Sequence, residues 1–206
     1  MVFTVKLIEK AIVVGFLFTV LFSLTGFANK CEDLSTKILR LHILANSDTK
    51  EDQDLKIKVR DKIIEKSGDF LNCATNKTDA KEIIAKNLEN IEKIAQEEIH
   101  SRGFNYPVHV ELTDMYFPTR HYDDKTLPAG HYDALRILIG NGKGHNWWCV
   151  IFPQMCLGSA KSNTACDSVL TDQENDVINS GEKYEIKFKV VDLFYTVKNF
   201  ILSLFN

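Results

Sequence analysis

The chain has 206 residues, of which 45% are hydrophobic and 26% charged, a composition typical of a globular protein with a real core. Its formal net charge is −3 and its pI is about 6.1, so it lacks the basic footprint of a nucleic-acid-binding protein. We therefore expect no nucleic-acid partner.

The first 28 residues predict export. Two lysines precede an uncharged apolar run over 11–28, in which Gly26 and Ala28 provide small residues at a cleavage point. The run also approaches the length of a short membrane helix. Residues 1–28 are therefore either a signal peptide or an uncleaved membrane anchor. In both cases we expect residues 29–206 to be exported as a single domain.

Export changes how the cysteines are interpreted. The chain has five, an odd number, so at least one thiol stays free or pairs between chains. Cys149 and Cys156 form the best candidate disulfide, because Pro153 between them favours a return of the chain. The alternative is that the exported thiols stay reduced. We expect no metal and no other cofactor, because there is no Cys-x-x-Cys motif and the six histidines are scattered.

The first strand of the domain is expected at 38–45. Aliphatic side chains alternate there with Arg40 and His42, which predicts one dry face and one polar face. Asp48 and Glu51 follow at the spacing of a capping box, which indicates that a helix begins directly after the strand.

Helices and strands occupy separate stretches of the remaining domain. Two helices are expected over about 49–71 and 78–101, each with one apolar stripe that suits packing on a sheet. The hydrophobic period then changes to two, which predicts strands over about 108–112, 132–139 and 147–152. Helices segregated from strands indicate an α+β fold, here a two-layer sandwich with a mostly antiparallel sheet.

A glycine-rich turn, GNGKG at 140–144, joins the last two of these strands. Asn-Gly is a strong hairpin signal, so we expect the two strands to be antiparallel partners. The turn does not match a phosphate-binding loop, because a strand follows it where that loop requires a helix.

The C-terminal part of the chain differs in composition. Residues 157–183 are polar and acidic, which predicts a flexible loop. From Tyr184 the sequence alternates as in a strand, through Ile186, Phe188 and Val190, and it ends as an amphipathic helix. That helix either packs against the domain or lies on a membrane surface.

Polar and aromatic side chains suggest a partner-binding surface on the sheet. Arg40 and His42 share one strand face, and Arg136 is expected beside them on a face that no helix covers. Trp147 and Trp148 are consecutive and point to opposite faces, so one indole leaves the helix-packed side. That indole is either a binding hot spot or is covered by a loop. The candidate partner-binding residues are Arg40, His42, Asn46, Asp48, Arg136, Asn146, Trp147 and Trp148.

The same residues form only incomplete catalytic sets. His42, Ser47 and Asp48 are the residue types of a triad, but no nucleophile-elbow pattern accompanies them. Cys149 offers thiol chemistry with nothing to fix its geometry. For Asp48 a capped helix with solvated ion pairs is the simpler interpretation. We assign no catalytic residue and expect no enzyme. The alternative is a secreted hydrolase acting on peptide or cell wall through His42 and Asp48 or through Cys149.

A resemblance to a known family rests on two long motifs, LRLHILANSDTKEDQDLKIKVRDKI and PAGHYDALRILIGNGKGHNWWCVIFPQMC. They closely resemble the stage II sporulation protein R family of endospore-forming bacteria over roughly 39–156. The segment KFKVV at 187–191 looks like the family's closing strand.

The resemblance implies a function without implying an active site. Members of the family are expected to be signals that are made in the forespore and exported into the space between forespore and mother cell. There they trigger a mother-cell membrane protease of the aspartic type, which cleaves the precursor of sigma-E. The chain would contact the membrane through its N-terminal segment if that segment stays uncleaved.

Overall fold

The computed structural model describes residues 2–122, 125–153 and 169–204. The structure divides the chain into two compact units, and the single exported domain over 29–206 stays a prediction. Unit 1 consists of Met1–Asp33, Pro118–Gly130 and Val177–Asn206. Unit 2 consists of Leu34–Phe117 and His131–Asp176.

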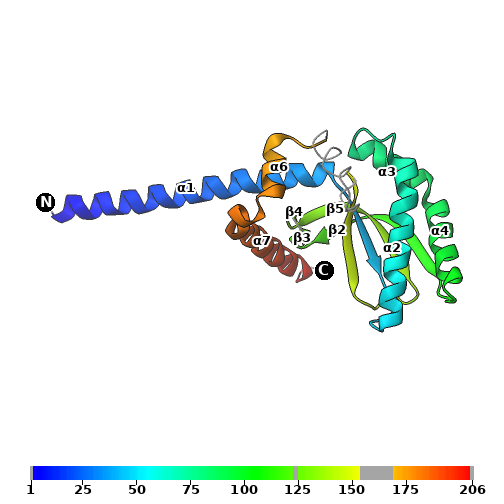
Figure 1. Cartoon of the computed structure of the whole chain (residues 1–206). Helices are drawn as coiled ribbons and strands as arrows, with labels where there is room; N and C mark the ends of the chain where they lie inside the picture. The colour runs from blue at the N-terminus through cyan, green and yellow to red at the C-terminus, as the bar shows by residue number, and fades with distance from the viewer. Residues whose placement is uncertain (1, 123–124, 154–168, 205–206) are drawn as a thin grey trace. The chain divides into compact units, whose positions relative to one another are not determined.

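The centre of unit 2 is a mixed four-stranded sheet with the strand order β2-β5-β1-β6 (Figure 1). The strands are β1 (Leu39–Leu44), β2 (Val108–Phe117), β5 (Gly130–Ile139) and β6 (Asn146–Phe152). Strand β1 runs parallel to β5 and antiparallel to β6. The predicted α+β class is confirmed. All four strands overlap the segments that alternation predicted, but β2 continues to Phe117, beyond the predicted end at 112.

The predicted hairpin between β5 and β6 is wrong, because β1 lies between these two strands. The glycine turn bonds to the two residues that directly follow β1. Gly144 N donates to Ala45 O at 2.9 Å, and Lys143 N donates to Asn46 O at 3.3 Å. The Asn-Gly signal correctly predicted a reversal of the chain. It could not predict that a third strand would occupy the space between the two arms.

Three helices cover one face of this sheet (Figure 1): α2 (Lys50–Leu71), α3 (Lys77–Lys86) and α4 (Leu88–Ser101). Leu39, Leu41 and Ile43, the predicted dry face of β1, are completely buried beneath them in one hydrophobic cluster. Burial of each such side chain stabilises the fold by about 1.5–3 kcal/mol. The predicted inward orientation of Leu135 and Ile137 in β5 is confirmed by the same cluster.

Two helix boundaries differ from the prediction. The N-cap of α2 is Thr49, whose hydroxyl accepts a hydrogen bond from Asp52 N at 3.3 Å, so the predicted capping box at Asp48 and Glu51 is displaced by one residue. The helix expected over 78–101 is broken at Asn87, whose side chain donates to Ile83 O at 2.8 Å. That bond competes with continuation of the helical ladder.

Unit 1 contains most of α1 (Val2–Lys37) and the two-stranded ladder of β3 (Arg120–Tyr122) and β4 (Lys125–Leu127). Helix α1 continues past residue 28, through the predicted cleavage point. Among the residues that the structure describes, no helix combines the length and apolarity needed to cross a membrane. The choice between signal peptide and anchor stays a prediction.

The C-terminal part of the chain is mainly helical over its described residues. It comprises α6 (Asp172–Asn179), the 3-10 helix η1 (Gly181–Tyr184) and α7 (Glu185–Ser203). The flexible loop predicted over 157–183 is therefore replaced by helix from 172 onward, while 157–168 lie outside the described residues.

The C-terminal amphipathic helix is confirmed, but it begins earlier than predicted. The strand expected at 186–190, which includes the start of the family's KFKVV segment, is part of α7. Phe188 and Val191 are the buried residues of α7 and lie three residues apart, at helical spacing. The short alternation was compatible with either period, and packing selected the helix.

Candidate functional site

A network of hydrogen bonds joins the end of β1 to the start of α2. Its centre is Asp52, which is 3% exposed and whose Oδ2 accepts from Ser47 Oγ at 2.6 Å and from Asn46 Nδ2 at 2.9 Å. Burial alone would raise the pKa of Asp52, but hydrogen bonds from Ser47, Asn46 and Tyr106 outweigh it and hold the pKa below its usual value. The buried carboxylate is therefore charged and fixes the loop around it.

The glycine turn docks on this network through Asn46. Asn46 Oδ1 accepts from the backbone N–H of Asn141 at 3.0 Å and from its side-chain amide at 3.2 Å. Gly140 has φ of 58°, and a Cβ there would collide with the Asn46 side chain. Glycine at this position thus satisfies both the backbone conformation and the close contact. The two motifs are bonded to each other although 95 positions separate Asn46 from Asn141.

Asp48 holds the other end of the turn. Its Oδ1 lies 2.6 Å from His145 N and 2.5 Å from His145 Nδ1, and both hydrogen bonds lower the pKa of the Asp48 carboxyl. The buried Lys56 donates to His145 O at 2.8 Å and to Gln53 Oε1 at 2.5 Å. Desolvation lowers the pKa of Lys56. Asn46 and Asp48, predicted as partner contacts, thus bind the turn within the protein itself.

Arg40 and His42 lie on the sheet face opposite the helices, as predicted, but neither is open to solvent. Arg40 is 0% exposed; its Nε donates to Cys149 O at 3.1 Å, and its guanidinium carbon lies 4.3 Å from the centroid of Phe117 and 5.1 Å from that of Tyr132. His42 is 3% exposed. Both side chains therefore lie beneath the surface of this face, and their contact with a partner stays a prediction.

His42 forms an aromatic platform for Trp148. The two rings are stacked, with centroids 4.1 Å apart and an interplanar angle of 8°, and Phe117 packs edge-on against Trp148 at 4.8 Å. His42 Nε2 lies 2.9 Å from Asn146 Oδ1. Burial lowers the pKa of His42, which the bond to Asn146 partly offsets and the nearby charge of Arg136 reinforces. The imidazole is therefore neutral at pH 7.

Arg136 and Trp148 flank His42 on this face, because both are its partners in the strand register. Arg136 Nη1 donates to Glu111 Oε1 at 2.9 Å, and the two side chains are 34% and 36% exposed. Trp148 is half-buried. We call Glu111, Arg136 and Trp148 the Trp148 face.

Trp147 points to the opposite, helix-covered side of the sheet, because consecutive strand residues alternate between the two faces. It is half-buried against the hydrophobic cluster, and the guanidinium carbon of Arg60 lies 4.3 Å from its ring centroid. Core packing and the cation–π contact give Trp147 a structural role. The tryptophan pair is therefore divided between the core and the Trp148 face.

Cys149 is disulfide-bonded, whereas Cys31 and Cys73 are free. The predicted partner, Cys156, lies outside the described residues, so the pairing of Cys149 with Cys156 stays a prediction. Burial raises the pKa of the Cys31 thiol to about 12. The disulfide leaves Cys149 without the thiolate that a cysteine nucleophile requires.

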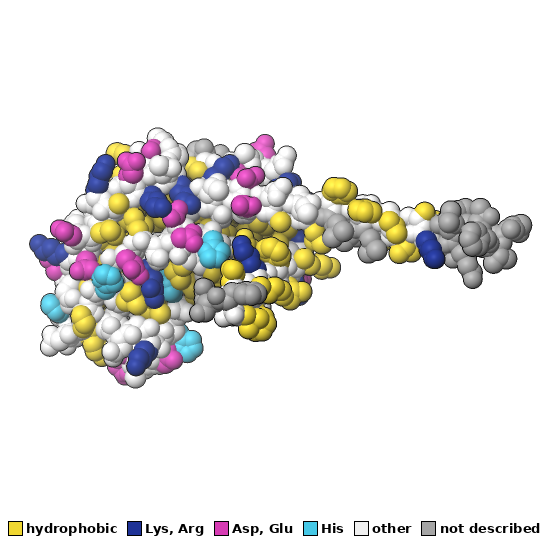
Figure 2. Space-filling model, turned by 180° about the vertical axis from the view of Figure 1, so that it is seen from behind, with side chains coloured by type: hydrophobic (Ala, Val, Ile, Leu, Met, Phe, Trp, Pro, Cys, Tyr) yellow, Lys and Arg dark blue, Asp and Glu magenta, His cyan; other side chains and the backbone are white. Residues whose placement is uncertain are grey.

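The residue sets of the hydrolase alternative are not brought together. The Asp48 carboxylate binds His145 and not His42, whose Nε2 faces Asn146. Within the described part of the chain, no group of three or more His, Cys, Asp or Glu side chains is placed to hold a metal ion. Figure 2 shows basic, acidic and histidine side chains interspersed on the visible face. The described arrangement suits recognition through shape and mixed polarity.

Sequence reasoning missed Phe117, Tyr106 and Asn141 as parts of the site. Phe117 stands six positions after Glu111 in β2, so the two side chains share a face by strand alternation, and this signal was readable. The bonds of Tyr106 and Asn141 depend on contacts between distant segments and had no local signal.

The fold and the site define an α+β protein that ties two distant motifs into one hydrogen-bonded surface. The chain belongs to the stage II sporulation protein R family, whose family model matches residues 35–162, and it accordingly has a role in sporulation. It is 40% identical over 118 residues to "Stage II sporulation protein R" of Bacillus subtilis (strain 168), covering 57% of this chain and 53% of that protein. The chain thus spans about half the length of this curated relative. No solved structure matches it.

Proposed function

We propose that this protein is the exported signal of endospore formation that passes from the forespore to the mother cell. In this role it activates the mother-cell membrane protease of the aspartic type that cleaves the sigma-E precursor. Family membership and the apolar N-terminal segment support the proposal. The segment would direct the protein into the space between the two membranes and would keep it attached if uncleaved.

The observation that carries the proposal is the Trp148 face. A half-buried tryptophan and a half-exposed arginine lie on either side of a buried, neutral histidine. Tryptophan and arginine are the residues most enriched among binding hot spots. Stacking on His42 holds the Trp148 indole in one orientation before any partner arrives, which reduces the entropy lost on binding.

A receptor-binding role needs this face and no chemistry. The Glu111–Arg136 pair presents one negative and one positive group. This arrangement favours a partner that offers both hydrogen-bond donors and acceptors over a partner that carries a high charge of one sign. Loss of a hot-spot side chain typically costs about 2 kcal/mol, or roughly thirtyfold in affinity. Removal of Arg136 should therefore interrupt signalling while the fold persists.

The test is processing of the sigma-E precursor in sporulating cells that express Arg136→Ala or Trp148→Ala. Arg102→Ala is a matched control, because Arg102 also binds a glutamate, Glu98, at 2.8 Å but lies at the end of α4. We expect both face variants to block processing, Arg136→Ala with a near-normal melting temperature, and the control to process normally.

Two outcomes would overturn the proposal. One is normal processing by a folded Arg136→Ala protein. The other is the pattern of a thiol enzyme, in which a folded Cys149→Ser protein loses all activity and the two face variants keep it. Trp148→Ala also removes the ring stacked on His42 and could therefore unfold the protein. In that case the test rests on Arg136→Ala alone.

A further inference from the structure

Helix α7 exposes one continuous apolar face. Its members recur at the spacing of a single helical stripe and are between 37% and 79% exposed. At 100° per residue they fall within about 120° of the helix circumference. The face consists of Ile186, Val190, Leu193, Phe194, Val197, Phe200, Ile201 and Leu204.

This face is distinct from the side on which α7 packs in unit 1. Phe188 and Val191 are buried on the opposite side of the helix. Phe188 packs edge-on against Phe27 of α1 with ring centroids 5.3 Å apart, and Lys187 Nζ donates to Ser23 Oγ at 3.1 Å. The helix is therefore already held in place without its exposed stripe. A second apolar face of this size marks an interaction surface.

The charges of α7 indicate what that surface meets. Lys198 follows one edge of the stripe, and Lys189, which also pairs with Glu185 at 2.6 Å, follows the other. Asp192 projects farther from the stripe. Lysines at the edges of an apolar stripe can keep their stems in an apolar layer and extend their ammonium groups to phosphate headgroups.

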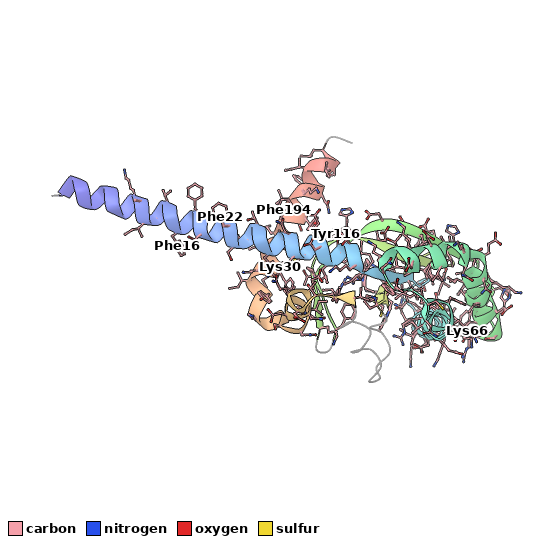
Figure 3. The ribbon with its side chains drawn as sticks, turned by 90° about the horizontal axis from the view of Figure 1, so that it is seen from above. Phe16, Phe22, Lys30, Lys66, Tyr116 and Phe194 are labelled. Atoms are coloured by element: carbon pink, nitrogen blue, oxygen red, sulfur yellow. The ribbon has the colours of Figure 1, made fainter. Side chains whose placement is uncertain are left out.

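Helix α1 also exposes apolar side chains in the same unit. Phe16, Phe18 and Phe22 are exposed on α1 before the residues that hold α7, Ser23 and Phe27. Figure 3 shows Phe16 and Phe22 projecting from α1 and Phe194 on α7. We propose that the exposed stripe of α7 binds the surface of an anionic phospholipid bilayer beside the apolar segment of α1. This inference does not depend on the identity of any receptor.

The test uses the full chain reconstituted with vesicles that contain brominated phosphatidylglycerol. Phe194→Trp places a reporter on the stripe, and Thr196→Trp places one at a neighbouring exposed position outside it. The chain has two native tryptophans, so the signal of the unmodified protein is subtracted. We expect the bromine atoms to quench the tryptophan at 194 and to leave that at 196 largely unquenched.

Equal quenching of the two reporters, or quenching of neither, would show that the stripe does not enter the lipid. If the 194 reporter is instead shielded in a concentration-dependent way without vesicles, a second copy of the chain occupies the stripe and the proposal is wrong. Phe200→Trp, on the same stripe, repeats the measurement if Phe194→Trp does not fold. Lys189→Gln with Lys198→Gln should weaken binding to anionic vesicles by roughly fivefold per lysine and leave binding to neutral vesicles unchanged.

Discussion

Replacement of Asp52 by alanine tests the network that ties the two family motifs together. Asp52 is nearly completely buried and accepts hydrogen bonds from Ser47, Asn46 and Tyr106. A hydrogen bond to a charged group contributes about 1.5–3 kcal/mol. The donors lie near the surface and can regain water in part, so we expect the free energy of unfolding to fall by about 3 kcal/mol, less than the sum of three bonds. Asp54→Ala, at an exposed position of the same helix, should change it by less than about 0.5 kcal/mol.

The assay is denaturant unfolding of the full chain followed by tryptophan fluorescence. Both tryptophans lie in β6, so the signal reports unit 2. The pKa of Asp52 is lowered in the folded protein, so its contribution is complete above the ordinary value of 3.8 and is lost as the pH falls through the lower folded value. The wild type and Asp52→Ala should therefore converge in acid. Equal stability of the Asp52 and Asp54 variants at neutral pH, or a wild-type advantage that persists unchanged in acid, would refute the reasoning.

Two further predictions concern the turn and the platform. Gly140→Ala should lose about 1–2 kcal/mol of stability because alanine disfavours the left-handed backbone there, and it should lose more because its Cβ displaces Asn46. Gly103 also has a positive φ but has open space around it. In the same unfolding assay, Gly103→Ala should therefore lose only the stability that the backbone conformation costs. The pKa of His42 is lowered by burial from 6.5, so protonation favours the unfolded chain and the wild type should lose stability as the pH falls below that value. His42→Phe should flatten this dependence between about pH 8 and pH 5, and an unchanged slope would contradict the burial of a neutral imidazole.

Local periodicity predicted the elements of unit 2 because each signal is contained within its own segment. The alternation in β1 identified Leu41 as inward and Arg40 as facing the other way, and the same logic divided Trp147 from Trp148. Period-two geometry specifies which face a side chain takes. It does not specify what lies over that face, and for this reason the burial of Arg40 and His42 was not predicted.

The predicted hairpin and the predicted strand at 186–190 failed for one physical reason, since each outcome depended on a partner that is distant in the sequence. The Asn-Gly turn indicated a hairpin, but whether β1 enters between the two arms depends on pairings formed across the whole sheet. At 186–190 the alternation was too short to separate a strand from a helix, and burial of Phe188 with Val191 decided the outcome. Short-range propensity is regularly overridden by such packing.

The position of β1 between β5 and β6 explains how two separate motifs build one polar and aromatic surface. The first motif supplies His42 from the central strand, and the second supplies Arg136 and Trp148 from the strands on either side. Asn46 and Asp48 then bond to the loop that connects those outer strands. A displacement of β1 by one residue would turn His42 to the helix side and remove the platform beneath Trp148. The polar network around Asp52 therefore supports the Trp148 face by helping to fix the register of β1.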